Sequence, residues 1–498
     1  MKTKFAKLLC LTLACLLLLT CFVACATGDE DETKKPGSTT SSNEADGDPV
    51  QAALDALGDI DWGGDDFTVL YNTEFASEVH AENGTVDQDG GSSQIINDAV
   101  YERNSLFEDR CKLVFKSVGK ESAAVTTAVQ NEAAAPTGDF QMIDHRLGDS
   151  ATLATGGYLF DFFELGVDLN GAWWDSGTAE FVLAGGVYFM SGSLNFADDG
   201  VTYVLIFNKD MQKTYSKTVP NPYQTARDGE WTLDYFNSVI QGISTDNGDG
   251  KWNENDTYGF ITTWEYGNTF FIGSDLRYIN NTNEDGEITL FLSDKVQMEK
   301  ALDVLELSQA IYHNNNASYM SPPGQEPLGL TAFQENRGLF YGEVVRQLTP
   351  LTKEMKTEFG IMPVPKYDKS QTYYRTWTHA SGSTFSVTSA IPAAQVETLG
   401  QIVQAYAILS HQYVKPAYYD IMLTSRNVHD ADSADMMDLM FANRIYEMSF
   451  YFNTFSFFDL FKTATNDNAD TFSSNYTAQA KTFDRRLSSL LRKLENKK

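Results

Sequence analysis

The chain has 498 residues, more than a single hydrophobic core usually organises, so two globular units are expected. Hydrophobic residues make up 42% and charged residues 21%, as in an ordinary soluble globular protein. The formal net charge of −31 argues against nucleic acid or an anionic membrane surface as a general partner, because such an acidic body repels phosphates.

The N-terminus has the pattern of a secretion signal. Three lysines within residues 2–7 precede an apolar run at residues 8–24, and no comparable run occurs later in the chain. The run ends in Phe22-Val23-Ala24-Cys25-Ala26, which resembles a bacterial lipobox, the signal for lipidating a cysteine and cleaving just before it. We therefore expect a lipoprotein signal peptide at residues 1–24 and palmitate among the lipid chains on Cys25.

Two alternatives to lipidation at Cys25 stay open. Phe22 stands where leucine is usual, so Cys21 is a competing lipidation site, and a plain signal peptide could be cut elsewhere. The following residues to about 60 are polar and predict a flexible tether, which for ~30 residues spans on the order of 30 Å. Cys111 is then the only other cysteine of the mature chain, which excludes an intramolecular disulfide and favours a small buried side chain at a helix end.

Strand-like and helix-like segments alternate in the first third of the chain. β-favouring residues predict strands at residues 67–71, 113–115 and 140–143, and helical spacing predicts helices at residues 92–111 and 123–135. This order is typical of a parallel α/β sheet.

The stretch from Asp139 to Lys209 stands out because apolar strand-like runs alternate there with glycines and aromatic residues. Open α/β sheets bind ligands at strand ends, so we expect this stretch to form one wall of a cleft and then to cross into a second lobe. Farther on, Thr232 is a predicted N-cap of an amphipathic helix, and helices near residues 301–311 and 483–494 are interpreted as packing elements.

Short motifs in order along the chain carry a family resemblance. They are Trp173-Trp174-Asp175, Ile206-Phe207-Asn208-Lys209, Asn221-Pro222-Tyr223, Asp228-Gly229-Glu230-Trp231-Thr232, Tyr258-Gly259-Phe260, Phe359-Gly360-Ile361-Met362-Pro363-Val364-Pro365, Ala390-Ile391-Pro392, Val414-Lys415-Pro416-Ala417-Tyr418-Tyr419 and Met436-Met437-Asp438-Leu439. In this order the chain resembles the bacterial extracellular solute-binding lipoproteins of ABC importers, in the sugar-binding, family 1-like group.

The resemblance implies an α/β, two-lobed periplasmic-binding-protein-like fold of type II, with discontinuous lobes joined by hinge strands. The expected lobes are residues 61–200 plus 381–430 and residues 201–380 plus 431–498, after a lipidated tether at residues 25–60. Crossings are expected near residues 200–204, 377–385 and 425–432. The resemblance also implies the expected partners: a mono- or oligosaccharide, an ABC permease, and a membrane that the protein contacts only through its lipid. A monomer on the outer face of a Gram-positive-type membrane is expected.

Sugars bind through aromatic faces and through side chains that hydrogen-bond hydroxyl groups. For each candidate taken alone, the alternative interpretation is a core residue, a surface residue or a partner in a salt bridge. About half of the aromatic candidates are expected to face the cleft. The expected ligand-binding residues are Asp144, Arg146, Trp173, Trp174, Asn195, Trp264, Tyr341, Glu343 and Trp377.

Residues 245–256 resemble an EF-hand or dockerin-type calcium loop. Asn247, Asp249, Gly250 and Asp256 occupy the third, fifth, sixth and twelfth positions, although the first is Thr245 in place of aspartate. An ordinary turn rich in glycine, asparagine and aspartate fits equally well. No cofactor is required on either interpretation, and structural calcium is possible.

No catalytic residue is assigned. The histidines lack zinc-site spacing, and no nucleophile elbow or phosphate-binding glycine loop is present. The export signal, the tether, the two-lobe pattern and the family resemblance together favour a lipid-anchored binding protein that passes a solute to an ABC permease and is not an enzyme. A secreted carbohydrate-active hydrolase and a cell-surface adhesion module are the alternatives.

Overall fold

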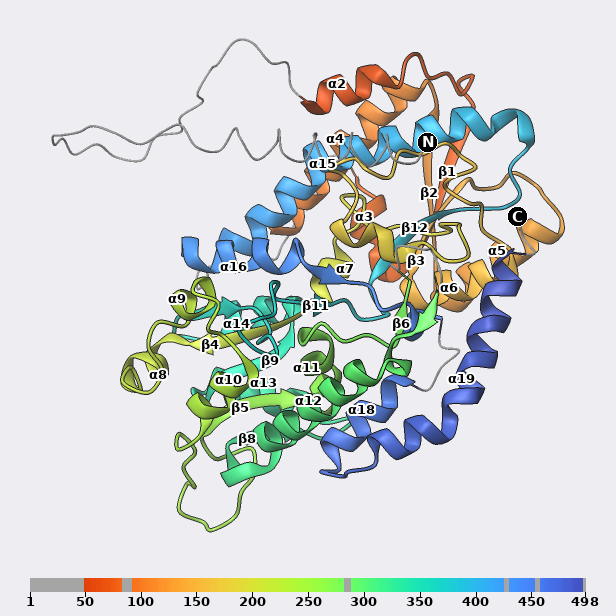
Figure 1. The fold of residues 1–498 in the computed structure, drawn as a ribbon. Coiled ribbons are helices and arrows are strands. Elements are labelled where there is room, and N and C mark those ends of the chain that lie inside the picture. The colour runs from red at the N-terminus through yellow and green to blue at the C-terminus, as the bar shows by residue number, and fades with distance from the viewer. Residues whose placement is uncertain (1–48, 83–91, 282–287, 425–429, 453–456, 496–498) are drawn as a thin grey trace, which may run out of the picture. The chain divides into compact units, whose positions relative to one another are not determined.

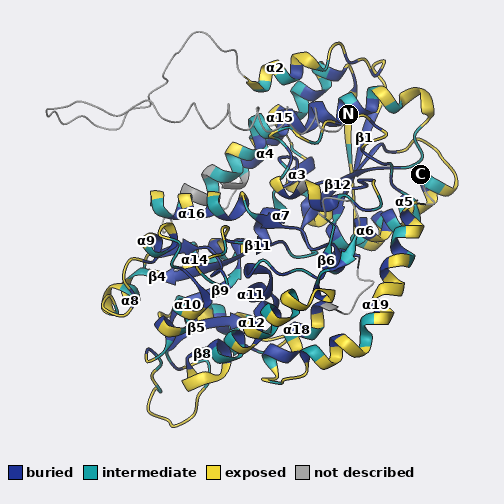
Figure 2. Cartoon of the chain, viewed as in Figure 1, coloured by how far each residue is buried: buried dark blue, intermediate teal, exposed yellow. Residues whose placement is uncertain are grey.

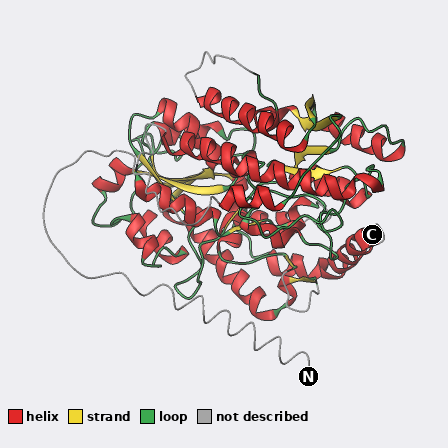
Figure 3. Ribbon diagram, turned by 90° about the horizontal axis from the view of Figure 1, so that it is seen from above, coloured by secondary structure: helices red, strands yellow, loops and turns green. Residues whose placement is uncertain are grey.

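A computed structural model describes residues 49–82, 92–281, 288–424, 430–452 and 457–495. Their strands form two main sheets and two short pairs, with helices on both sides of the strands (Figure 1, Figure 3). The predicted signal peptide, Cys25 and the tether up to residue 48 lie outside the described residues.

The first sheet has the order β12-β3-β1-β2. Its strands are β1 (Asp66–Asn72), β2 (Val114–Lys120), β3 (Met142–Arg146) and β12 (Ser383–Val387). β1 pairs in parallel with β2 and with β3, whereas β12 is antiparallel to β3. The parallel α/β pattern predicted for this region is thus confirmed, with one antiparallel strand added from far along the chain.

The second sheet has the order β10-β4-β9-β5-β8. Its strands are β4 (Tyr203–Asn208), β5 (Tyr258–Thr263), β8 (Ser318–Ser321), β9 (Gly338–Val344) and β10 (Phe359–Met362). β5 is parallel to β8 and β9, while β4 is antiparallel to β9 and β10. Every residue of β4 and β5 is buried, as expected for central strands covered on both faces (Figure 2).

Helices cover both sheets. Those nearest the first sheet are α3 (Ala76–Val79), α4 (Ser92–Cys111), α5 (Ser122–Ala134), α6 (Leu147–Gly156) and α15 (Val396–Thr424). The second sheet is accompanied by α8 (Lys209–Thr214), α9 (Pro222–Arg227), α10 (Leu233–Ile240), α11 (Gly267–Gly273), α12 (Lys295–His313), α13 (Pro327–Gln334), α14 (Leu348–Glu354), α16 (Ala431–Phe441) and α18 (Phe457–Asn466). The remaining helices are α2 (Pro49–Ala56), α7 (Ala197–Gly200), α17 (Met448–Tyr451) and α19 (Phe472–Glu495).

The chain passes between the sheets in a narrow region of short strands. α7 leads directly into β4, and Thr202 bridges to Thr378. The two-residue strands β11 (Thr376–Trp377) and β13 (Arg444–Ile445) pair there in parallel. A second short pair joins β6 (Ile279–Asn280) to β7 (Thr289–Leu290). The crossing expected at residues 425–432 falls largely outside the described residues.

Several local predictions are confirmed. α4 spans the predicted residues and ends at the buried Cys111, and Thr232 caps α10 by accepting a hydrogen bond from Tyr235 N. The folded part begins earlier than the predicted tether boundary at residue 60, because α2 forms and Leu54 and Ile60 are buried. Among the described helices, none combines the length and apolar character needed to span a membrane.

Candidate solute-binding site

Carboxyl ends of strands from both sheets carry polar and aromatic side chains. In the first sheet, Glu74 follows β1 and Arg146 ends β3, so their parallel pairing brings them to one edge. Arg146 Nε donates to Glu74 Oε2 at 2.9 Å, and Nη2 donates to the other oxygen. Both side chains are partly exposed, at 37% and 48%. The guanidinium predicted to reach a ligand is therefore forked onto Glu74.

In the second sheet, Trp264 and Glu265 follow β5, and Glu343 and Arg346 lie at the end of β9. Trp264 Nε1 donates to Glu326 Oε1 at 3.0 Å, which fixes the ring. The Lys462 ammonium of α18 lies 4.4 Å from the centre of that ring. We call Glu74, Arg146, Trp264, Glu265, Glu343, Arg346 and Lys462 the strand-end cluster.

Electrostatic effects connect the two parts of the strand-end cluster. Burial, together with the nearby cations Arg346, Lys462 and Arg146, lowers the pKa of His379 to about 4. The cations that act on this imidazole come from both parts of the cluster. Burial also raises the pKa of Glu265 and of Glu343, and the guanidinium of Arg346 opposes both shifts. The cluster can offer hydrogen-bond donors, acceptors and an aromatic face to one ligand.

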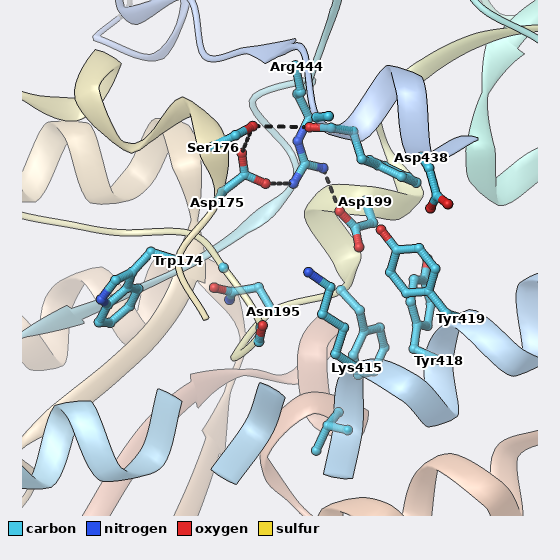
Figure 4. Close-up of a pocket in the computed structure, with 16 residues that line it drawn as sticks. Trp174, Asp175, Ser176, Asn195, Asp199, Lys415, Tyr418, Tyr419, Asp438 and Arg444 are labelled. Atoms are coloured by element: carbon cyan, nitrogen blue, oxygen red, sulfur yellow. Dashed lines mark hydrogen bonds and ion pairs between the residues drawn. The ribbon is translucent and has the colours of Figure 1, made fainter. Parts of the chain in front are cut away.

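A separate pocket of about 310 Å³ surrounds Arg444 (Figure 4). Arg444 is almost fully buried, and its Nη1 donates to Asp199 Oδ1 at 2.6 Å and to Thr202 Oγ1 at 3.0 Å. Its Nη2 pairs with Asp175 and lies 3.3 Å from Asp198 Oδ2. Burial raises the pKa of Asp199 to about 7, with Arg444 acting in the opposite direction. We call this the Arg444 pocket.

Side-chain oxygens of Asp175, Asp198 and Asp199, one from each residue, lie within 4.8 Å of one another. In the described part of the chain, no other three histidine, cysteine, aspartate or glutamate side chains come together in this way. Arg444 already supplies the cation between them, so the cluster is an ion-pair network. Gly192 lets the loop close over it: a Cβ there would lie 2.4 Å from Trp173 O.

Six of the nine predicted ligand-binding residues lie in these two places or beside them. Trp264 and Glu343 belong to the strand-end cluster with Arg146, and Trp174 and Asn195 line the Arg444 pocket. Trp173 is half-buried beside that pocket and packs against its own loop at Gly171.

Asp144, Tyr341 and Trp377 lie in the core. Burial and the neighbouring Glu78 raise the pKa of Asp144 well above its usual range. Tyr341 stacks on Phe333 with ring centres 5.3 Å apart, and Trp377 stacks on Tyr203 at 4.6 Å. All three are in or beside strands covered on both faces, so an adjacent polar residue in the sequence does not imply exposure.

Four residues of these two places were not predicted from the sequence: Glu74, Arg346, Lys462 and Arg444. Glu74 follows β1 just as Arg146 ends β3, so the strand-end rule could have found it. Arg346, Lys462 and Arg444 come from a turn, a helix and a two-residue strand, where no local pattern signals the site.

The calcium-like loop lies apart from both places and is closed by a bridge between Thr245 and Thr257. Asp256 is buried and accepts from Asn247 N at 2.8 Å and from Asn253 N at 2.7 Å. Asp249 Oδ1 accepts from Lys251 N at 2.7 Å. Backbone amides thus donate hydrogen bonds to the same side-chain oxygens that would bind a metal ion.

Two α/β sheets joined by short crossing strands form a two-lobed fold of the periplasmic-binding-protein type. Three of the solved structures with a similar fold illustrate the likeness. The maltose-binding periplasmic protein of Listeria monocytogenes in complex with maltose is 15% identical, with a TM-score of 0.50 over 87% of this chain and 97% of its own. A sugar transporter of Rhizobium etli in an open conformation is 14% identical, with a TM-score of 0.50 over 86% and 98%.

A cyclo/maltodextrin-binding protein complexed with maltotetraose is 11% identical, with a TM-score of 0.50 over 87% of this chain and 97% of its own. No protein-family model and no curated protein sequence matches the chain. At these identities the likeness shows the fold. At that level, the α/β two-lobed fold class and the resemblance to sugar-type solute-binding proteins of ABC importers are confirmed.

Proposed function

We propose that this protein captures a carbohydrate between its two lobes and delivers it to an ABC permease without altering it chemically. The observation that supports the proposal is the strand-end cluster, in which polar, charged and aromatic side chains follow the carboxyl ends of strands in both sheets. Trp264 offers an apolar face to sugar C–H groups, and Glu265, Glu343 and the neighbouring cations suit hydroxyl groups.

The test measures ligand binding and product formation together. Thermal melting and calorimetry of the chain from Ala26 onward, against maltose, maltotriose, maltotetraose and raffinose, should show binding of a few sugars with no reducing sugar released. Trp264→Ala should weaken binding at least tenfold, because it removes the stacking face. Trp252→Ala is the matched control, since Trp252 is 41% exposed and outside the cluster. Absence of binding across sugars, polyols and peptides would overturn the proposal in favour of adhesion.

A hydrolase remains the alternative that one observation favours, namely the raised pKa values of Glu265 and Glu343. A glycosidase needs one carboxyl group that stays protonated near neutral pH. Release of reducing sugar that disappears in Glu265→Gln or Glu343→Gln would establish the enzyme instead.

We further propose that lipid on Cys25 holds the protein on the outer face of a Gram-positive-type membrane as a monomer. The signal-like residues 1–24 and the lipobox-like sequence support this placement. In a Gram-positive host, Cys25→Ser should move the protein from the membrane fraction to the medium and abolish palmitate labelling. Cys21→Ser is the matched control and should remain membrane-bound; the reverse result would assign the lipid to Cys21.

A further inference from the structure

The Arg444 pocket has an unsatisfied polar group in its wall. Asn195 is 4% exposed, yet neither Oδ1 nor Nδ2 of its side chain has a hydrogen-bond partner. A buried amide without a partner is unfavourable, because it has lost its hydrogen bonds to water. Figure 4 shows Asn195 among the side chains that line the pocket, beside Lys415. The pocket therefore presents a buried donor and acceptor that a ligand could satisfy.

Lys415 is the second polar group of the wall. Within the described residues, no carboxylate lies within 4.0 Å of its ammonium group, although it acts electrostatically on Asp199 and on Asp438. The wall therefore presents an ammonium group and carboxylates to a ligand. A hydroxyl group fits both, because it donates to a carboxylate and accepts from an ammonium group or an amide.

The remaining wall is aromatic. Phe196 stacks on Tyr418 with ring centres 4.7 Å apart, and Trp174 lines the same space. Aromatic side chains next to hydroxyl-binding groups are suited to a sugar ring or a cyclic polyol. The volume of about 310 Å³ is at the lower end of the range for small-molecule sites and suits one ring rather than a chain.

The walls of the pocket come from both lobes. Phe196, Val414 and Tyr418 pack with Ile96 and Val100 of α4. Phe441, in contrast, packs with residues of β4 and β10 in the core of the second sheet. The pocket shares no lining residue with the strand-end cluster, so the two places can be tested separately.

We propose that the Arg444 pocket is a second binding site, which takes one monosaccharide or cyclic polyol through Asn195, Lys415 and the aromatic side chains of its wall, among them Phe196 and Tyr418. The site goes beyond the proposed transport function, because the strand-end cluster binds the transported sugar with or without it.

The experiment separates the two sites by starting from Trp264→Ala, in which strand-end binding is weakened. Calorimetry of the chain from Ala26 onward is carried out with glucose, galactose, mannose, N-acetylglucosamine and myo-inositol, up to about 10 mM, which detects affinities near 1 mM. We expect at least one probe to bind at one molecule per chain. Adding Asn195→Leu should weaken that binding at least tenfold, and adding Lys415→Ala should weaken it severalfold.

Controls keep each result decisive. Lys217→Ala changes an exposed lysine outside the pocket and should leave the affinity unchanged. Lys415→Ala changes a half-buried side chain, so it tests the site even if Asn195→Leu fails to fold. No saturable binding of any probe to Trp264→Ala overturns the second site, as does binding that Lys415→Ala leaves intact. Failure of the transport proposal is seen separately, as absence of oligosaccharide binding to the unsubstituted chain.

Discussion

At the scale of single residues, Glu78 makes stability depend on pH. Its side chain is fully buried, and Oε1 accepts from the backbone N–H groups of Phe196 and Ala197 and from Ser383 Oγ. Burial raises its pKa from 4.5 to about 7, partly opposed by those backbone hydrogen bonds. Between these values the folded state holds a proton that the unfolded state has released, so this group makes stability fall as pH rises from 4.5 to 7.

We expect Glu78→Gln to flatten that fall, because glutamine keeps the acceptor oxygen and cannot ionise. Urea unfolding at pH 5, 6, 7 and 8 measures it as the difference from the unsubstituted chain. Glu102→Gln, on the exposed face of α4, serves as the control and should reproduce the original pH dependence. If the free energy of unfolding of Glu78→Gln and of the original chain changed with pH in parallel, Glu78 would be ionised over the whole range from pH 5 to 8.

Arg444 holds together three carboxylates that would otherwise repel one another inside the protein. Its guanidinium contacts Asp175, Asp198 and Asp199, and the side chain is 3% exposed. Removing one partner of a buried ion pair costs about 3–5 kcal/mol, so Arg444→Met should lower the free energy of unfolding by that amount. Arg227→Met removes an arginine that pairs at the surface and should have a far smaller effect. Similar losses in the two variants would contradict a special role for the network.

At the scale of elements, the loop at residues 245–256 is held by its own backbone hydrogen bonds. We propose that it requires no metal, because Asp256 accepts from two backbone amides and the neighbouring oxygens are also engaged. Asp256→Ala should cost about 1–3 kcal/mol in chemical unfolding, whereas EDTA or calcium should not change the melting temperature of the original chain. A melting temperature that rises with calcium in the original chain, but not in Asp249→Ala, would instead show an occupied calcium loop.

The elements that the sequence predicts well are those with local signals. The helical spacing of apolar residues predicted the bounds of α4, and Thr232 predicted the start of α10. Both predictions depend on signals that act within a few residues, namely periodicity and capping. The direction of a side chain depends on distant partners instead. Trp377 has polar neighbours in sequence, yet it is buried against Tyr203, since β11 lies among crossing strands. Lys462 reaches Trp264 only because α18 packs beside α11, which no local pattern reveals.

At the scale of the whole molecule, the proposed capture requires the two lobes to move together around the sugar. Arg146 and Glu74 belong to the first sheet, and Trp264, Glu265 and Glu343 to the second, so a ligand that touches both sets stabilises a closed arrangement. A ligand shifts that equilibrium only by its difference in affinity for the two arrangements. Side chains on one edge alone would therefore bind sugar without closing the protein.

We expect small-angle X-ray scattering to show a smaller radius of gyration when the chain from Ala26 onward is saturated with a sugar that it binds. Arg146→Ala should retain part of the affinity through the second sheet but lose most of the compaction, because it removes a contact from the opposite edge. Arg227→Ala, on a surface helix away from the cluster, is the control and should close like the original chain. Tight binding with an unchanged radius of gyration would place the sugar on one lobe and remove closure from the mechanism.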